Sequence, residues 1–333
     1  MSTPVVEIVA SRDPGAALAA RRFHDPRSDA WIGPATHLAT ERRRLEGLRW
    51  RHFRARQLGA TLGAEIDGLD LRGPLSEAAV AELRQALLDY KVIFFRDQPL
   101  SPAQHVAFAH RFGELEVHPF IPANADHPEL VRFEKSADVA GYENSWHHDV
   151  TWREVPSFGA VLHAIRVPEV GGDKLFSDMY AAYDALDEET RQRIERLDAA
   201  HDFMRSFGGQ IPPERREELR ARYPAVVHPA VVRHPETGRR LLYVNRIFTE
   251  RILGLSDEES SALLRRLCRQ AETVEHQVRF RWRNGSVAFW DNRAVQHYAS
   301  SDYWPEVRIM ERASIVGTRP SRCARSGQRD ESK

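Results

Sequence analysis

Cysteine is nearly absent from this sequence, since Cys268 and Cys323 are the only two among 333 residues. Two cysteines cannot build a disulfide framework or a thiolate zinc site, so both kinds of scaffold are excluded. Long apolar runs are missing as well, because no stretch approaches the length of a membrane-spanning helix and the N-terminus has no signal-peptide core. These absences predict a soluble cytoplasmic protein that does not act at a membrane.

An excess of charge of either sign is also absent. Lys and Arg together number 48, and so do Asp and Glu. No overall field would therefore draw the protein to nucleic acid or to an anionic membrane, and any recognition by charge must be local. What is present is ordinary: 42% of the residues are hydrophobic, which is typical of a packed globular protein.

The chain divides into three parts by composition. Residues 1–55 are rich in Ala, Arg and Pro and show no clear period, which predicts an N-terminal extension that is poorly ordered or packed on the surface. The basic run at 42–44 could form a nucleic-acid arm, but the zero net charge favours a solvated leader and no nucleic-acid partner. Residues 56–317 form the predicted folded domain, and the polar residues 318–333 a loose C-terminal tail.

Within the folded domain, short apolar segments alternate with turns, and helices begin at serine caps. The predicted helix starts are Ser76, Ser101, Ser177 and Ser256. Residues 92–95 predict a buried strand, and residues 278–282 and 287–289 predict a hairpin that turns at Asn284-Gly285. Many short strands with helices between them predict a mainly β fold with helical cover (α+β) around a jelly-roll core, the double-stranded β-helix.

The first chemical signal lies in residues 145–152. His147 and Asp149 are two positions apart, and their aromatic and β-branched neighbours favour an extended backbone. On a strand, positions i and i+2 point to the same face, so the imidazole and the carboxylate aim at one point, and His148 at the opposite face. This pair is two-thirds of the facial triad of two histidines and one carboxylate that holds non-haem Fe(II).

A second signal lies far downstream, where His297 offers a third ligand. Residues 306–316 alternate in polarity, and they place Arg308 and Arg312 on one face, about 13 Å apart at ~3.3 Å per residue. That spacing suits two anions on either side of a shared metal. A zinc hydrolase could use the same three ligands, but it would not require two arginines beside them.

Four linked motifs, W-H-x-D-V-T, G-G-D-x-L-F, W-D-N-R-x-x-Q-H-Y-A and R-I-M-x-R, occur in this order. Their order and spacing resemble those of the TauD/TfdA family of Fe(II)- and 2-oxoglutarate-dependent dioxygenases, the taurine dioxygenase branch above all. The resemblance runs from about Leu58 to about Gly317. It implies that His147, Asp149 and His297 bind Fe(II), that 2-oxoglutarate and O₂ are co-substrates, and that the chain forms a homodimer or homotetramer.

The resemblance also implies anion-binding roles. Arg308 matches the position that binds the far carboxylate of 2-oxoglutarate, for which a planar, always-charged guanidinium is suited. Where the family usually has a threonine, this chain has Lys174, which could be a second cation for that carboxylate, a substrate contact, or a side chain that extends to solvent. Arg312 matches the position that binds the substrate sulfonate in the taurine branch, and its alternative is a surface salt bridge.

Further pocket residues follow from the same resemblance. His118 corresponds to the histidine that helps hold the sulfonate. Phe207 and Tyr243 match aromatic walls of the pocket, with Ser206 beside Phe207, although ordinary core packing would account for Tyr243 equally well.

Two departures lie at the other end of the substrate. Ile121 and Glu143 replace the tyrosine and the asparagine that surround the taurine amine in that branch. The anion-binding end of the site is thus retained while the other end has changed. A longer alkyl sulfonate, a sulfate ester, or an amine-bearing acid held by Glu143 all fit this pattern.

Three hypotheses follow. The leading one is an enzyme that hydroxylates a small alkyl sulfonate or sulfate ester and releases succinate, CO₂, an aldehyde, and sulfite or sulfate. The second is a 2-oxoglutarate-dependent hydroxylase of a different acid, such as an amino acid or an aryloxyalkanoate. The third is a non-catalytic metal-binding jelly-roll protein, against which the intact ligands and Arg308 count.

Overall fold

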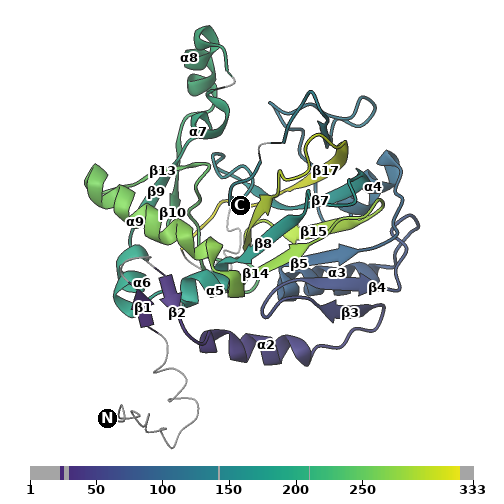
Figure 1. Ribbon diagram of the computed structural model, residues 1–333, viewed down its shortest axis with the longest axis horizontal. Helices are drawn as coiled ribbons and strands as arrows, with labels where there is room; N and C mark the ends of the chain where they lie inside the picture. Colours follow the sequence, from purple (N-terminus) through teal and green to yellow (C-terminus); the bar gives the residue numbers. More distant parts are fainter. Residues whose placement is uncertain (1–22, 26–29, 142, 210, 323–333) are drawn as a thin grey trace, which may run out of the picture.

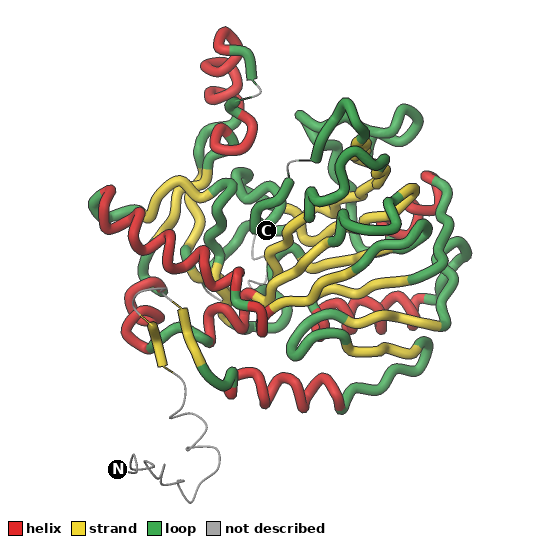
Figure 2. Tube along the Cα trace, in the orientation of Figure 1, coloured by secondary structure: helices red, strands yellow, loops and turns green. Residues whose placement is uncertain are grey.

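A seven-stranded sheet forms the centre of the protein, for which the computed structural model describes residues 23–25, 30–141, 143–209 and 211–322. In spatial order its strands are β3 (Arg54–Gln57), β4 (Ala64–Asp67), β5 (Val92–Phe95), β15 (Val287–Asp291), β7 (Ser157–Arg166), β17 (Arg308–Val316) and β6 (Leu130–Lys135). All neighbours are antiparallel except β4 and β5. Figure 2 shows these strands side by side, with helices along one side of the sheet.

A second sheet packs against one face of the first. Its three strands are β14 (Gln277–Phe280), β8 (Lys174–Asp178) and β16 (Val295–Ala299), in that order. Aromatic side chains fill the space between the sheets: Phe94 stacks on Phe280 with ring centroids 4.0 Å apart, and Phe176 lies against Trp290 at 5.7 Å. Two facing, mainly antiparallel sheets with this apolar filling confirm the predicted jelly-roll core.

Helices cover the other face of the large sheet, as expected. They are α2 (Ala39–Glu46), α3 (Glu77–Tyr90) and α4 (Pro102–His110), and the short helix η1 (Thr36–Leu38) directly precedes α2. The predicted caps hold, because Ser76 accepts the backbone N–H of Ala79, and Ser101 forms a complete capping box with Gln104. Leu83 and Phe108 of these helices are buried in one cluster with Phe289 of the sheet.

A long excursion separates the motif regions, between β8 and β14. Its elements are α5 (Met179–Asp184), α6 (Glu188–Ile194), β9 (Asp198–His201), α7 (Met204–Phe207), α8 (Pro213–Arg222), β10 (Val226–Pro229), β11 (Val231–Arg233), β12 (Arg240–Leu242), β13 (Thr249–Ile252), α9 (Asp257–Arg269), η2 (Gln270–Glu272) and η3 (Val274–His276). The capping box predicted at Ser256 opens α9. In Figure 1, α7 and α8 protrude beyond the rest of the molecule.

Two local predictions were wrong. The segments on either side of Asn284-Gly285 do not form a hairpin, because β14 pairs with β8 in the small sheet while β15 lies between β5 and β7 in the large one. The turn therefore carries the chain from one sheet to the other, a connection that alternation in a single segment does not reveal. The cap of α5 is Asp178, whose carboxylate accepts two backbone N–H groups, and not the neighbouring Ser177.

Part of the predicted N-terminal extension is packed against the core. Leu45 of α2 is 2% exposed, and Glu41 accepts a hydrogen bond from Lys91 Nζ at 2.8 Å. Arg44 pairs with Asp89 of α3 at 2.6 Å. This helix thus packs on the surface of the domain through partners that lie far away in the sequence, while residues 42–44 stay exposed. The described elements before it are η1 and the strands β1 (Phe23–Asp25) and β2 (Ala30–Ile32), which pair with each other.

Among the described residues, no helix combines the length and the apolar composition needed to cross a bilayer.

Candidate active site

The two histidine ligands predicted from distant motifs are joined directly through their backbones. His147 N–H donates to the carbonyl of His297 at 3.1 Å, and His297 N–H donates to the carbonyl of His147 at 2.8 Å. This isolated antiparallel bridge brings the imidazole centroids to 4.3 Å from each other. The bridge thus aligns β16 of the small sheet with the segment that carries the first ligand.

Asp149 follows in a turn, and the strand predicted through this segment was wrong. The chain leaves the bridge after His147, and Val150 has a positive φ of 48°. Asn292 stabilises the turn: its Oδ1 accepts the N–H of Asp149 at 2.7 Å and its Nδ2 donates to the carbonyl of Asp149 at 3.0 Å. The side chain of Asp149 therefore reaches the histidines from a turn and not from a pleated face.

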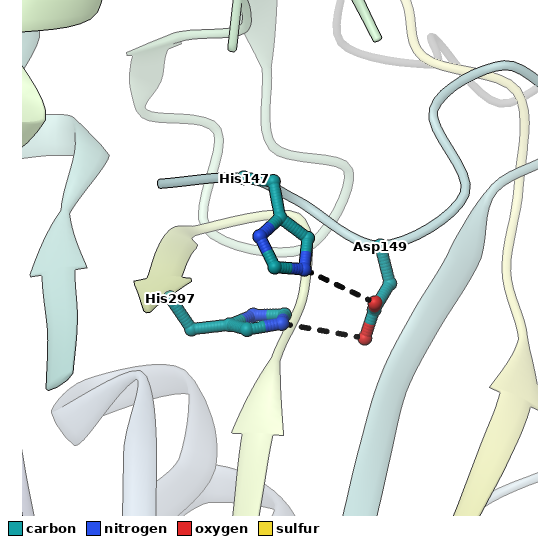
Figure 3. A group of neighbouring side chains, drawn as sticks. All are labelled: His147, Asp149 and His297. Carbon is teal, nitrogen blue, oxygen red and sulfur yellow. Dashed lines mark ion pairs between the residues drawn. The ribbon is translucent and has the colours of Figure 1, made fainter. Parts of the chain in front are cut away.

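The three side chains converge as a metal site requires. Each of His147, Asp149 and His297 offers one ligand atom, and these atoms all lie within 4.8 Å of one another. Nε2 of His147 is 3.7 Å from Oδ1 of Asp149, and Nε2 of His297 is 3.7 Å from Oδ2 (Figure 3). Two imidazoles and one carboxylate on one side of a point leave positions open for other ligands, which is the donor set of non-haem Fe(II) oxygenases.

The protonation states of the three residues suit a metal. Nδ1 of His147 donates to the carbonyl of Ser145 at 2.8 Å, which leaves the Nε2 lone pair facing the site. Burial lowers the pKa of both His147 and His297, so the imidazoles are neutral. Burial raises the pKa of Asp149, but the positive charges nearby, Arg312 above all, lower it by more, so the net pKa is below its usual value. Neutral imidazoles and an ionised carboxylate bind a cation without first losing protons.

Both predicted arginines extend from β17 into the same cavity. Arg312 Nη1 donates to Oδ2 of Asp149 at 2.9 Å, and this pair with a candidate metal ligand is buried, so the alternative of a surface salt bridge is excluded. Arg308 is 7% exposed, and its Nε has no hydrogen-bond partner in the part of the chain that the structure describes. A Cβ at Gly172, whose φ is +68°, would lie 3.1 Å from that Nε, so glycine gives the guanidinium room.

Lys174 also points inward, which excludes the solvent-directed alternative. It is 6% exposed and its Nζ lies 4.8 Å from the ring centroid of Trp290. Burial lowers its pKa to about 7, although the nearby Asp149 opposes the shift. The lysine that replaces the usual threonine is thus a third basic group beside the metal ligands, together with Arg308 and Arg312.

These groups line one cavity of about 380 Å³. Ten of the predicted site residues belong to its lining, namely His118, Glu143, His147, Asp149, Lys174, Ser206, Phe207, His297, Arg308 and Arg312. Most of the remaining lining is apolar and includes Ile121, Phe133, Val139, Val150, Leu162, Ile247, Phe248 and Met310. The cavity is therefore charged around the ligands and mostly apolar elsewhere, apart from Arg132, Glu134 and Lys135 of β6.

His118 presents a donor to this cavity. Its Nδ1 accepts the backbone N–H groups of Phe120 and Ile121 at 3.2 and 3.1 Å. Burial lowers its pKa to about 3, with help from Arg312, so the ring is neutral and its proton lies on Nε2. A neutral imidazole with Nδ1 occupied in this way can donate to an anion from Nε2.

Tyr243 does not line the cavity, and the pocket-wall interpretation of this residue was wrong. It is 2% exposed and its ring packs against His148, with centroids 4.8 Å apart. The prediction left core packing open as the alternative, and that is what the tertiary structure provides.

Two residues of the site were missed. Lys135, at the end of β6, lies opposite Arg308 in the sheet register and pairs with Glu143 at 3.0 Å across the cavity. Asn292 was quoted only as a letter of a motif, although it holds the Asp149 turn. The alternation of β6 could have indicated Lys135, whereas nothing local to Asn292 points to its distant partner.

Comparison with known proteins agrees with this geometry. Residues 54–314 match the family model described as taurine catabolism dioxygenase TauD, TfdA family. An alpha-ketoglutarate-dependent sulfate ester dioxygenase of Pseudomonas putida is 35% identical over 267 residues, 78% of this chain and 88% of that protein. An (S)-phenoxypropionate/alpha-ketoglutarate-dioxygenase of Sphingobium herbicidovorans is 36% identical over 281 residues, 80% and 96% of the two chains.

The crystal structure of a taurine dioxygenase from Burkholderia xenovorans superposes with a TM-score of 0.72 at 35% identity, and the match covers 84% of this chain and 93% of that one. Alpha-ketoglutarate is the 2-oxoglutarate of the resemblance described above. The non-catalytic alternative loses its support, because the ligands, the basic groups and the named activities of the relatives agree. This chain belongs to the TauD/TfdA family of taurine catabolism dioxygenases and is a 2-oxoglutarate-dependent dioxygenase.

Proposed function

We propose that this dioxygenase hydroxylates a small organic anion with an apolar body, most favourably an alkyl sulfate ester or an alkyl sulfonate. The observation that carries this proposal is the division of one cavity into a basic end at the metal ligands and an apolar remainder. The basic end suits two anions, the co-substrate and the substrate, and the apolar remainder suits a hydrocarbon chain.

His147, Asp149 and His297 hold the metal in this proposal. Bound there, Fe(II) would supply the O₂-activating chemistry that couples oxidative decarboxylation of 2-oxoglutarate, to succinate and CO₂, with hydroxylation of a substrate C–H bond. The bridge between His147 and His297 fixes both imidazoles relative to each other. The protein thereby determines where the oxidant forms, and the cavity determines which carbon lies beside it.

Arg308 and Lys174 bind the far carboxylate of 2-oxoglutarate. Arg308 has an unsatisfied buried Nε, and an unpaired buried donor is costly unless a ligand accepts from it. The Nζ of Lys174 lies close enough to Arg308 for the two charges to affect each other, which allows both to face one carboxylate. In this arrangement Lys174 takes the place of the threonine hydroxyl of the family pattern.

Arg312 and His118 bind the anionic group of the substrate. Arg312 holds Oδ2 of Asp149 through Nη1, while its buried Nε has no partner among the described residues. His118 Nε2 is a neutral donor on the same cavity. A sulfate or sulfonate offers three oxygens, so it can accept from both residues at once.

The body of the substrate lies against the apolar lining, beside Phe207 and Ser206 of α7. Glu143 was a candidate to hold a substrate amine, but its carboxylate pairs with Lys135 at 3.0 Å. The pair neutralises the charge that would attract an ammonium group. An uncharged chain therefore fits this end better than an amine-bearing acid does.

The expected products follow from the carbon that is hydroxylated. If that carbon carries a sulfate ester, the product collapses to an aldehyde and sulfate. If it carries a sulfonate, the product collapses to an aldehyde and sulfite. In both cases one oxygen atom of O₂ enters succinate and the other enters the substrate.

A second candidate substrate class is the aryloxyalkanoates. Phe133, Phe207 and Phe248 supply aromatic faces to the cavity, which suit a phenoxy ring, and the Sphingobium relative is named for phenoxypropionate. A carboxylate would then occupy the place of the sulfate beside Arg312.

A substrate panel tests the proposal. Purified enzyme with Fe(II), ascorbate and 2-oxoglutarate is supplied with alkyl sulfates of increasing length, alkyl sulfonates, phenoxyalkanoates and amino acids. Succinate is measured together with sulfate, sulfite and phenol. We expect stoichiometric sulfate or sulfite with succinate, whereas phenol release alone would favour the second candidate, and turnover of amino acids alone would contradict both.

We also propose, by family analogy, that the chain forms a homodimer or homotetramer in the cytoplasm, where 2-oxoglutarate and Fe(II) are supplied. The domain division at residues 55/56 and 317/318 is part of the same proposal; it agrees with a family match that runs from 54 to 314. Light scattering on the eluting peak of a size-exclusion column measures the assembly. A monomeric mass would contradict it.

A further inference from the structure

Asn292 belongs to the W-D-N-R motif, yet it binds no metal and lines no part of the cavity described above. It is 1% exposed, and its amide makes three hydrogen bonds to the backbone of another segment. Oδ1 accepts the N–H of Asp149 at 2.7 Å, and Nδ2 donates to the carbonyls of Asp149 and Ser157 at 3.0 and 3.2 Å. One side chain therefore satisfies both polar backbone groups of a metal ligand.

The two ligands of the H-x-D segment are held in different ways. His147 is fixed by the backbone bridge to His297, which needs no particular side chain. Asp149 lies beyond the bridge, where the chain turns and Val150 takes a φ of 48° that a β-branched residue rarely adopts. Such a turn persists only when its surroundings hold it, and the amide of Asn292 provides the contacts to its backbone.

Asn292 is itself well anchored. Its N–H donates to the carbonyl of Phe158 at 3.0 Å, which ties it to β7. The preceding Asp291 is fixed by His234 at 3.0 Å and by Arg293 at 2.7 Å, and all three are largely buried. The amide thus follows the anchored end of β15 and can hold the Asp149 turn in place.

The carboxylate of Asp149 has a different partner, Arg312. That contact is made by Nη1, and Nε of Arg312, which has no partner among the described residues, is the group left for the substrate anion. The contacts of Asn292 are to the backbone of the Asp149 turn, so they involve neither the carboxylate nor the substrate.

We propose that Asn292 is the positioning residue of the carboxylate ligand, and that it holds the Asp149 turn in the geometry that binds the metal. Asn292 affects metal affinity through Asp149 and does not need to contact the substrate. It rests on the three-residue metal site and not on the substrate class proposed above.

The test is the affinity of the full-length protein for Mn(II) alone, measured by calorimetry with wild type and Asn292→Ala. We expect the dissociation constant to rise at least about tenfold, the usual effect of losing a group that orients a ligand. Co(II) gives a second readout, because displacement of the carboxylate alters its visible absorption spectrum. Neither measurement requires substrate, so failure of the substrate proposal would leave the result interpretable.

Gln98→Ala is the matched control. Gln98 is also buried, and its amide likewise accepts one backbone N–H, of Leu71, and donates to two carbonyls, of Leu69 and Arg96. It contacts no residue of the metal site. Both variants should lower the melting temperature, but only Asn292→Ala should weaken Mn(II) binding.

Wild-type Mn(II) affinity in a folded Asn292→Ala protein would overturn the proposal, and so would an equal loss of affinity in Gln98→Ala. If Asn292→Ala does not fold, Asn292→Asp decides by the same criterion. Aspartate keeps the acceptor for Asp149 N–H but places a carboxylate oxygen against two carbonyls, so weaker Mn(II) binding is expected. Unchanged Mn(II) binding and an unchanged Co(II) spectrum in that variant would reject the role.

Discussion

The cavity has two parts with different linings: the inner end, which contains the metal ligands, and the remainder, called here the outer end. The inner end gathers His147, Asp149 and His297 with three basic side chains, and its contacts are specific in distance and direction. The other lining side chains are mostly apolar, with the ion pairs of Lys135 with Glu143 and of Arg132 with Glu134 among them. Directional polar contacts determine which reaction is possible, whereas an apolar wall discriminates substrates only by volume and shape.

This contrast explains why the reaction class was predictable and the substrate was not. A metal site needs particular residue types at particular spacings, which leave a recognisable pattern in the sequence. An apolar wall can be assembled from many residues, and a change of one methylene alters affinity only modestly. Substitutions at the inner end should therefore reduce activity far more than substitutions at the outer end.

The largest effect is expected at the inner end from Asp149→Ala. Loss of the carboxylate removes one metal ligand and leaves Arg312 without its partner, so succinate formation should fall by more than about a thousandfold. His148→Asn is the control, because His148 lies between the ligands but packs against Tyr243. If the His148→Asn enzyme were as inactive as Asp149→Ala, the assignment of Asp149 as a ligand and His148 as a non-ligand would be contradicted.

A smaller effect is expected from Lys174→Ala. Removal of a charge-assisted contact to the co-substrate should raise the KM for 2-oxoglutarate by about 10- to 100-fold, with kcat less affected. Lys135→Ala is the matched control, since Lys135 is a buried lysine of the same cavity that pairs with Glu143. Equal increases in KM for both variants would show that general positive charge, not position, matters.

The smallest effect is expected at the outer end from Ile121→Tyr. A larger, polar side chain there should reduce kcat/KM for long-chain substrates by about three- to tenfold while the KM for 2-oxoglutarate stays unchanged. Steady-state kinetics with a short and a long alkyl sulfate measure the ratio. A change in the KM for 2-oxoglutarate, without a change in the preference for chain length, would mean that the two ends are not separate.

Local features of the sequence predicted local structure well. The caps at Ser76, Ser101 and Ser256 open helices as expected, because a cap depends on residues within one turn. The alternation of residues 308–316 placed Arg308 and Arg312 on one face, and both line the cavity. Period and capping are properties of a short segment, so a short segment reveals them.

Predictions that required a distant partner failed or were missed. The expected hairpin at Asn284-Gly285 is a crossing between two sheets, since β14 finds its partner in β8. Asp149 lies in a turn because Asn292 holds its backbone, although its neighbours favour a strand. In each case the competing contact comes from more than a hundred residues away.

The sequence by itself pointed to the metal ligands, the two arginines and the jelly-roll class, through residue types, the alternation around Arg308 and Arg312, and the resemblance of its motifs to the TauD/TfdA family. Only the tertiary structure decided that Lys174 points inward, that Tyr243 packs in the core, and that Glu143 is neutralised by Lys135. The physical reason is that the direction and charge of a side chain depend on what surrounds it. Those surroundings are assembled from segments that meet only when the chain has folded.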